Sequence, residues 1–380
     1  MSATEDTVDE FLKAISTFKS MKDSLDANFT NGLKEIFTIK ELSDQLGKYL
    51  HDLRRNKPNE DILQQIIAVA PTCLSYTNEK GRLPIHTAAR YTGSARYVPL
   101  LAKEGIKFKV GGGSKRGGLL VKVTGKDYGT NALQMLANLS SRTNTIPTDT
   151  TYLDVMKELR DSNLLLKEDI KDHNLLLYAC CRNSQLRFDF LVDWDAKGLL
   201  TYKFKGLPIV LATVKYFPTH DRLSAFLETA LRLHPGDLGG FFLKDKEGKT
   251  VCERAFAKYG IEKTMKILGN LIPFEDPHFP ILHHVAKHAP QYMNDFVNRY
   301  PSAIYLRDCK GRTLHQDALA SGSKKFKSHA MFFVGMSDDQ VREIDPVTEL
   351  YPFMVAASGQ MSDLDAVYYL MKKDPSLAKT

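Results

Sequence analysis

Hydrophobic residues recur at intervals of three and four along most of the chain, which is the spacing of helices that bury one face. Such stripes run through residues 61–70, 152–159 and 363–371. Two more lie in the first 57 residues, on either side of Asn31 and Gly32. The pattern predicts an all-α protein in which residues 1–57 form a helical hairpin that caps an array of helices over 58–380. A coiled-coil dimer is the alternative interpretation of the two N-terminal stripes.

Turn signals divide the chain at recurring places. Pro71 precedes Gly81 by ten residues, and Pro301 precedes Gly311 by the same distance. In both segments an Asn or Asp lies three residues before the glycine. Proline ends a helix because its ring does not fit a continuing one, and Asx-x-x-Gly forms a turn whose side chain binds backbone amides. The chain is therefore expected to alternate between helices and short turns.

Short apolar segments of similar shape follow these turns. The clearest, residues 83–89, reads Leu-Pro-Ile-His-Thr-Ala-Ala. Proline is tolerated in the first turn of a helix, and small residues at the end allow neighbouring helices to approach closely. New helices are predicted to start near residues 84, 132, 176, 208, 251, 281, 313 and 352.

At these residues the sequence resembles the ankyrin repeat, whose signature is Thr-Pro-Leu-His-x-Ala. The resemblance covers roughly residues 60 to 380 and implies an ankyrin-like helical repeat solenoid of about eight repeats. It also implies a non-enzymatic scaffold that binds another protein through its turn tips and concave face. The family's histidine bonds backbone groups across the repeat, and His86, His283 and His315 stand at that position here.

Side chains at the predicted turn tips are the candidate partner-binding residues. The tip over 201–205 combines two aromatic residues with two lysines, and exposed aromatic residues are typical anchors of protein interfaces. The full set of candidates is Tyr202, Lys203, Phe204, Lys205, Tyr128, His173 and Lys246.

A basic, glycine-rich insert near 106–126 is predicted to form a β-hairpin with a mobile glycine tip. Gly113 and Gly118 have the spacing of a nucleotide-binding loop, but Leu119 and Leu120 stand where that loop needs Lys and a hydroxyl. Basic residues of the insert could bind an acidic or phosphorylated ligand, or nucleic acid, through 103–126. They are Lys107, Lys109, Lys115, Arg116, Lys122 and Lys126. Nucleic acid is less favoured because few aromatic residues lie between the lysines.

Catalytic signatures are weak. The segment 278–288 holds His278, His283, His284 and His288, which makes a metal-dependent enzyme a further alternative, but no His-Glu-x-x-His is present. Cys180 and Cys181 lie in an apolar segment where thiols pack as small core residues. No enzymatic activity, cofactor or metal is therefore expected.

Composition adds limited detail. The formal net charge of +7 favours acidic partners without identifying one. No stretch approaches 18 consecutive apolar residues, so no membrane insertion is expected, and the acidic N-terminus does not suggest a secretory signal. Five scattered cysteines fit a reducing compartment. A cytoplasmic location is predicted, with the nucleus as an alternative.

Overall fold

The computed structural model describes residues 39–124, 129–138, 146–180, 184–216, 220–272, 279–320, 336–358 and 362–379. The structure is 68% helix and 2% strand, which confirms the all-α prediction. Contacts divide the chain into two compact units, Met1–Gly198 and Leu199–Thr380, which are described separately.

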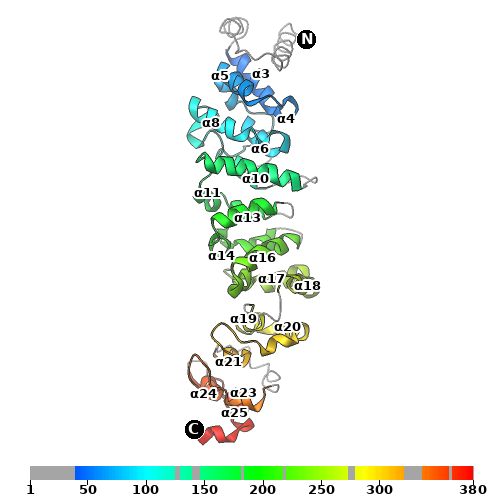
Figure 1. The fold of residues 1–380 in the computed structure, drawn as a ribbon, viewed down its shortest axis with the longest axis vertical. Helices are drawn as coiled ribbons and strands as arrows, with labels where there is room; N and C mark the ends of the chain where they lie inside the picture. Colours follow the sequence, from blue (N-terminus) through cyan, green and yellow to red (C-terminus); the bar gives the residue numbers. More distant parts are fainter. Residues whose placement is uncertain are drawn as a thin grey trace. The chain divides into compact units, whose positions relative to one another are not determined.

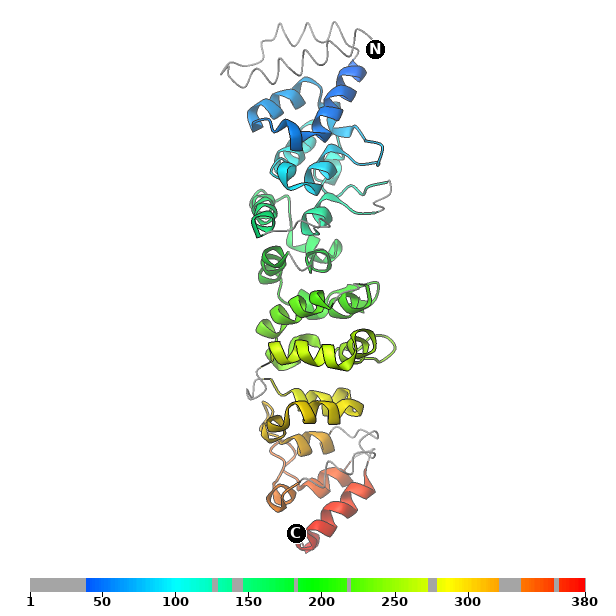
Figure 2. The same cartoon turned by 90° about the vertical axis from the view of Figure 1, so that its right-hand side faces the viewer.

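The first unit is built from pairs of short helices (Figures 1 and 2). Helix α9 packs against α6 and α12, whereas the longer α10 packs against α8 and α13. Two layers of helices result, one containing α6, α9 and α12 and the other containing α8, α10 and α13. The elements are α3 (Ile39–His51), α4 (Leu53–Asn56), α5 (Glu60–Val69), η2 (Pro71–Ser75), α6 (Pro84–Arg90), α7 (Thr92–Ala95), α8 (Val98–Phe108), η3 (Gly113–Lys115), α9 (Ala132–Ala137), α10 (Ile146–Asp161), α11 (Lys167–Asp172), α12 (Leu175–Ala179) and α13 (Gln185–Trp194), followed by α14 (Gly198–Thr201), which begins at the boundary.

The second unit follows the same plan. Helix α15 packs against α17, and α21 packs against both α19 and α24, while α16 packs against α18. Its elements are β1 (Lys203–Phe204), β2 (Leu207–Pro208), α15 (Ile209–Tyr216), α16 (Asp221–Leu233), η4 (Pro235–Gly240), α17 (Val251–Tyr259), α18 (Ile261–Leu271), α19 (Ile281–His288), η5 (Pro290–Tyr292), α20 (Met293–Arg299), η6 (Pro301–Tyr305), α21 (Leu314–Ala320), α23 (Asp338–Arg342), α24 (Pro352–Ala357), α25 (Leu364–Lys373) and η8 (Pro375–Lys379).

The predicted helix starts agree with the structure. A helix begins within one residue of each of the eight predicted positions, at α6, α9, α12, α15, α17, α19, α21 and α24. The turns before them also form as expected. Asn78 Oδ1 accepts hydrogen bonds from the amides of Lys80 and Arg82, and Gly81 takes a φ of 67°. Asp308 does the same for Lys310 and Arg312.

In several of the helices that follow a turn, the side chain of the third residue links the start of that helix to a later loop. Nδ1 of His86 accepts a hydrogen bond from the Leu83 amide, and Nε2 donates to the Val121 carbonyl at 2.7 Å. Gln134 bonds the Asn131 amide through Oε1 and donates to the His173 carbonyl through Nε2. Each contact satisfies a backbone group at the start of a helix and another in the following loop, where an unpaired group would cost free energy.

In the second unit His283 makes the second half of this contact, because its Nε2 donates to the Leu306 carbonyl at 3.1 Å. In α21 the contact is made by Gln316, which donates to the carbonyls of Glu343 and Ile344. The assignment of this position to His315 was therefore wrong by one residue. The helix starts at Leu314, so Gln316 is its third residue.

The β-hairpin predicted for the basic insert is wrong for its described residues, 106–124. Helix α8 extends to Phe108, and a 3₁₀ turn with further turns follows. Gly112, Gly117 and Gly118 have φ values of 87°, 60° and 95°, which do not suit a strand. The glycines are not a mobile tip either. A Cβ on Gly117 would lie 1.9 Å from the Ala102 carbonyl oxygen, so the segment packs directly on the backbone of α8.

The predicted N-terminal cap lies mostly outside the described residues, because residues 1–38 are not among them. The end of its second stripe is described, and Leu42, Leu46, Leu50 and Leu53 are buried as expected. The boundary at residue 57 stays a prediction.

Gln134→Ala is expected to lower the free energy of unfolding by about 3 kcal/mol, because the buried Asn131 amide and the His173 carbonyl lose their partner. Chemical denaturation measures the change. Gln340→Ala is the matched control, since Gln340 accepts from the Ser337 amide in a capping contact at an exposed helix start. Its loss should stay below about 1 kcal/mol. Equal losses in the two variants would contradict a stabilising role for the bond to His173.

Candidate functional site

The tip predicted over 201–205 forms the hairpin of β1 and β2. Lys203 pairs with Pro208 and Phe204 with Leu207, and the connection is the two-residue turn Lys205-Gly206. Both turn residues have positive φ, at 50° and 79°. Two-residue hairpin turns of this kind match the twist of the strands and project their side chains from the fold.

Phe204 and Tyr216 form an aromatic pair beside this turn. Their ring centroids lie 5.5 Å apart with an interplanar angle of 86°, the edge-to-face arrangement that aromatic rings prefer. Lys205 Nζ lies 5.4 Å from both ring centroids. Tyr216, at the end of α15, remains 41% exposed. Ring packing and cation–π contacts together hold half-buried Phe204 and exposed Lys205 and Tyr216 in one arrangement.

Lysines surround the pair. Lys203, Lys205 and Lys215 are exposed, and Lys215 Nζ lies 5.8 Å from the Tyr216 ring centroid. We call Lys203, Phe204, Lys205, Lys215 and Tyr216 the tip cluster. It combines apolar area with positive charge, and that combination suits an acidic segment that also carries apolar side chains.

Lys258 lies next to the cluster and secures the end of α15. Its Nζ donates to the carbonyl of Val214 at 2.5 Å and to that of Lys215 at 3.2 Å. Desolvation by burial lowers the pKa of Lys258. The amine thereby provides hydrogen-bond donors to carbonyl groups in the last turn of α15, and a cation near the C-terminal end of a helix is stabilising.

The other predicted tip residues that the structure describes have surroundings of their own. His173 belongs to the first unit, and its Nδ1 accepts a hydrogen bond from Asn131 at 3.2 Å while its carbonyl binds Gln134. Burial lowers the pKa of His173, although Asp169 opposes the shift. His173 therefore helps to hold two loops together. Tyr202 is half-buried, Lys246 is exposed in the turn of Asp245, and Tyr128 lies outside the described residues.

The predicted basic patch is partly neutralised in the structure. Arg116 forms an ion pair with Asp169 and donates to the Leu164 carbonyl, so its charge links the glycine-rich segment to α11. Lys107 Nζ lies 3.1 Å from Glu104. Of the other predicted residues, Lys109, Lys115 and Lys122 are exposed, and Lys126 lies outside the described part of the chain.

The histidine-rich segment divides into two environments, and His278 is not among the described residues. His284 and His288 stack on Phe242, with ring centroids 5.7 and 6.1 Å away. Burial lowers the pKa of His288 to about 4, with the nearby His284 adding to the shift. His283 instead lies beside Asp308 and Asp317, with one ligand atom from each residue within 4.8 Å of the others. These three residues could hold a metal ion.

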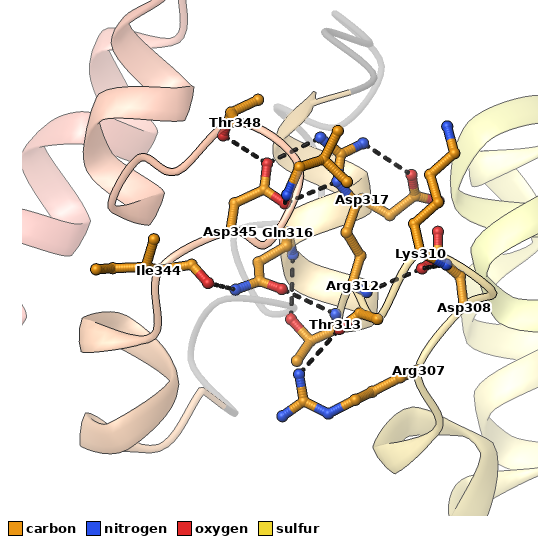
Figure 3. A network of polar contacts seen from close by, with 12 residues as sticks. Arg307, Asp308, Lys310, Arg312, Thr313, Gln316, Asp317, Ile344, Asp345 and Thr348 are labelled. Atoms are coloured by element: carbon orange, nitrogen blue, oxygen red, sulfur yellow. Dashed lines mark hydrogen bonds and ion pairs between the residues drawn. The ribbon is translucent and has the colours of Figure 1, made fainter.

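A polar network next to that group links α21 to the loop before α24 (Figure 3). Nε and one terminal nitrogen of Arg312 each donate to Asp345 at 2.8 Å, and Thr348 Oγ1 donates to the same carboxylate. Figure 3 shows the guanidinium between the carboxylates of Asp345 and Asp317, with 3.8 Å separating Arg312 from Asp317. A two-pronged pair of this type fixes both partners in orientation as well as distance.

Comparison with known proteins finds no protein-family model that matches the chain and no curated protein that is significantly similar to it. Within the described ranges, every helix is too short or too polar to cross a lipid bilayer.

The Arg312–Asp345 pair predicts a loss of stability in acid. Burial raises the pKa of Asp345, but the bonds from Arg312 and Thr348 outweigh it and lower the pKa to about 2. Because the folded value lies below the usual value near 4, the contribution is full above about pH 4 and is lost as the pH falls towards 2. After allowance for screening by solvent, we expect about 1–2 kcal/mol.

Denaturation of the wild type and Asp345→Asn between pH 5 and 2 measures this contribution. The stability difference between them should be largest above pH 4 and shrink towards pH 2. Asp365→Asn, which changes an exposed carboxylate of the same unit, should differ from the wild type by a small and nearly constant amount. A wild-type advantage over Asp345→Asn that does not change with pH would contradict the assignment.

Proposed function

We propose that this protein is a non-enzymatic ankyrin-type repeat scaffold that binds another protein through the tip cluster. The observation that carries the proposal is the edge-to-face pair of half-buried Phe204 and exposed Tyr216, with exposed lysines around it. Aromatic residues held in place at a surface lose little conformational freedom on binding, so they make efficient anchors. The partner we propose is a protein segment with acidic and apolar side chains.

The repeat assignment rests on the resemblance and on recurring local geometry. Asx turns with a following glycine precede α6, α17 and α21, and third-residue side chains join successive turns within each unit. Continuation of these repeats as one solenoid over 58–380 is part of the proposal. Repeat arrays suit scaffolds because each repeat adds surface while contacting only its neighbours.

The basic insert is the weaker candidate surface. Arg116, at the centre of the predicted patch, is engaged with Asp169, and Lys107 is paired with Glu104. Both ion pairs reduce the positive charge that a nucleic acid or phosphorylated ligand would meet. A nuclease arm in the experiment below separates this alternative from a protein partner. The cytoplasm is the compartment in which we propose that binding takes place.

Site-specific crosslinking tests the proposal. A photoreactive phenylalanine analogue is placed at Tyr216, and the same analogue at Tyr305, which is 80% exposed in the same unit, serves as the control. Illumination in an extract of the source cells should give a discrete protein adduct from position 216 and none from position 305. The adduct should survive nuclease, and its peptide at the crosslink should be acidic.

Charge reversal supplies the second arm. Lys205→Glu together with Lys215→Glu should reduce the adduct at position 216 at least tenfold, because an acidic segment is then repelled. Lys263→Glu, which alters an exposed lysine of α18, should leave the yield unchanged. Identical adducts at positions 216 and 305, an adduct destroyed by nuclease, or no effect of charge reversal would overturn the proposal.

A further inference from the structure

His283 has one ring nitrogen that the repeat contact does not use. Its Nε2 donates to the Leu306 carbonyl, which can only accept, so Nε2 holds a proton. At the equivalent His86, Nδ1 accepts from the amide of Leu83. The residue before α19 is Pro280, which has no N–H. Nδ1 of His283 is accordingly buried without a hydrogen bond, on a residue that is 3% exposed.

Two carboxylates face this nitrogen. Oδ2 of Asp317 lies 3.5 Å from Nδ1, and Asp308 brings a third ligand atom into the same group, all within 4.8 Å of one another. Asp308 Oδ1 accepts two turn amides, but a carboxylate has two oxygens and about four lone-pair sites. A lone pair directed at two carboxylates is unfavourable unless a cation lies between them.

Nearby charges narrow the identity of that cation. Arg312 is 3.8 Å from Asp317, yet its two best-aligned donors are directed at Asp345 (Figure 3). The cation between the groups is either a proton on Nδ1 or a metal ion.

We propose that His283, Asp308 and Asp317 bind a divalent transition-metal ion, with Zn²⁺ as the expected occupant. Imidazole and carboxylate ligands suit zinc, and three protein ligands leave a fourth position for water. The Nε2–H bond to the Leu306 carbonyl provides the outer contact that commonly orients a metal-binding histidine. Nδ1 lies 3.5 Å from Oδ2 of Asp317, which is close to the separation of two atoms that are each bound at about 2 Å to one tetrahedral zinc ion.

A metal ion here would join two successive repeats of the second unit. His283 belongs to α19, Asp308 to the turn before α21, and Asp317 to α21 itself. Coordination would add to the bond between His283 and Leu306 at the same junction. The ion would therefore act as a structural clamp between α19 and α21, and ion binding should raise thermal stability.

Zinc titration of the full-length chain against a chromophoric chelator tests the site. All proteins carry Cys309→Ser, so that this exposed thiol does not contribute. Asp308→Asn is the central variant, because Asn78 holds the corresponding turn of the first unit with an amide and the fold should persist. Asp317→Asn removes the second carboxylate. Asp245→Asn is the matched control, since Asp245 holds the same kind of turn but is paired with Arg254.

The parent protein should bind one Zn²⁺. Asp308→Asn and Asp317→Asn should each lower the affinity for zinc at least tenfold, while Asp245→Asn should bind zinc as tightly as the parent does. Zinc should raise the melting temperature of the parent and of Asp245→Asn but not of the other two. Equal binding by all four proteins, or no zinc bound by the parent, would overturn the proposal. In the second case Nδ1 holds a proton, and Asp317 is its ion-pair partner.

Discussion

Short helices impose the constraint on which the rest of this structure depends. A helix of six or seven residues leaves most of its first amides unbonded, and the loops beside it leave carbonyls unbonded as well. Here a single side chain at the third helical position satisfies one group of each kind. His86, Gln134 and Gln316 do this with rings or amides that have a donor at one end and an acceptor at the other. At His86 and Gln316 the helix follows an Asx turn with a glycine of positive φ.

The fold was predictable where local chemistry decides it. Proline, Asx-x-x-Gly and helical spacing each act on their own few neighbours, and together with the resemblance to the ankyrin signature they placed the helix starts to within one residue. The basic insert failed for the opposite reason. Its glycines suggested a hairpin tip. In the structure there is no room for a side chain at Gly117, because the Ala102 carbonyl of α8 lies against it, and such a contact between separate segments leaves no local signal. The misplaced histidine of α21 arose because no proline marks where this helix begins.

The candidate sites were predictable only in part. Two residues of the hairpin, Phe204 and Lys205, were identified from composition. Tyr216 lies at the far end of the following helix and gave no local signal. Asp308 and Asp317 likewise could not be recognised as candidate ligands from the sequence, because only the packing of α21 against α19 brings them close to His283. One sequence signal was present and missed. Pro280 stands before α19 and has no N–H, so it cannot donate the hydrogen bond that Nδ1 of His283 would otherwise accept.

The bonds between successive turns also bear on how the chain folds as it is made. Each joins residues that are 35, 39, 23 or 27 positions apart, at His86, Gln134, His283 and Gln316 respectively. A junction can therefore close once only a few dozen further residues have left the ribosome, and no junction waits for the C-terminus. Contacts of such short range favour rapid folding, and they allow the first unit to be complete while the second is still being synthesised.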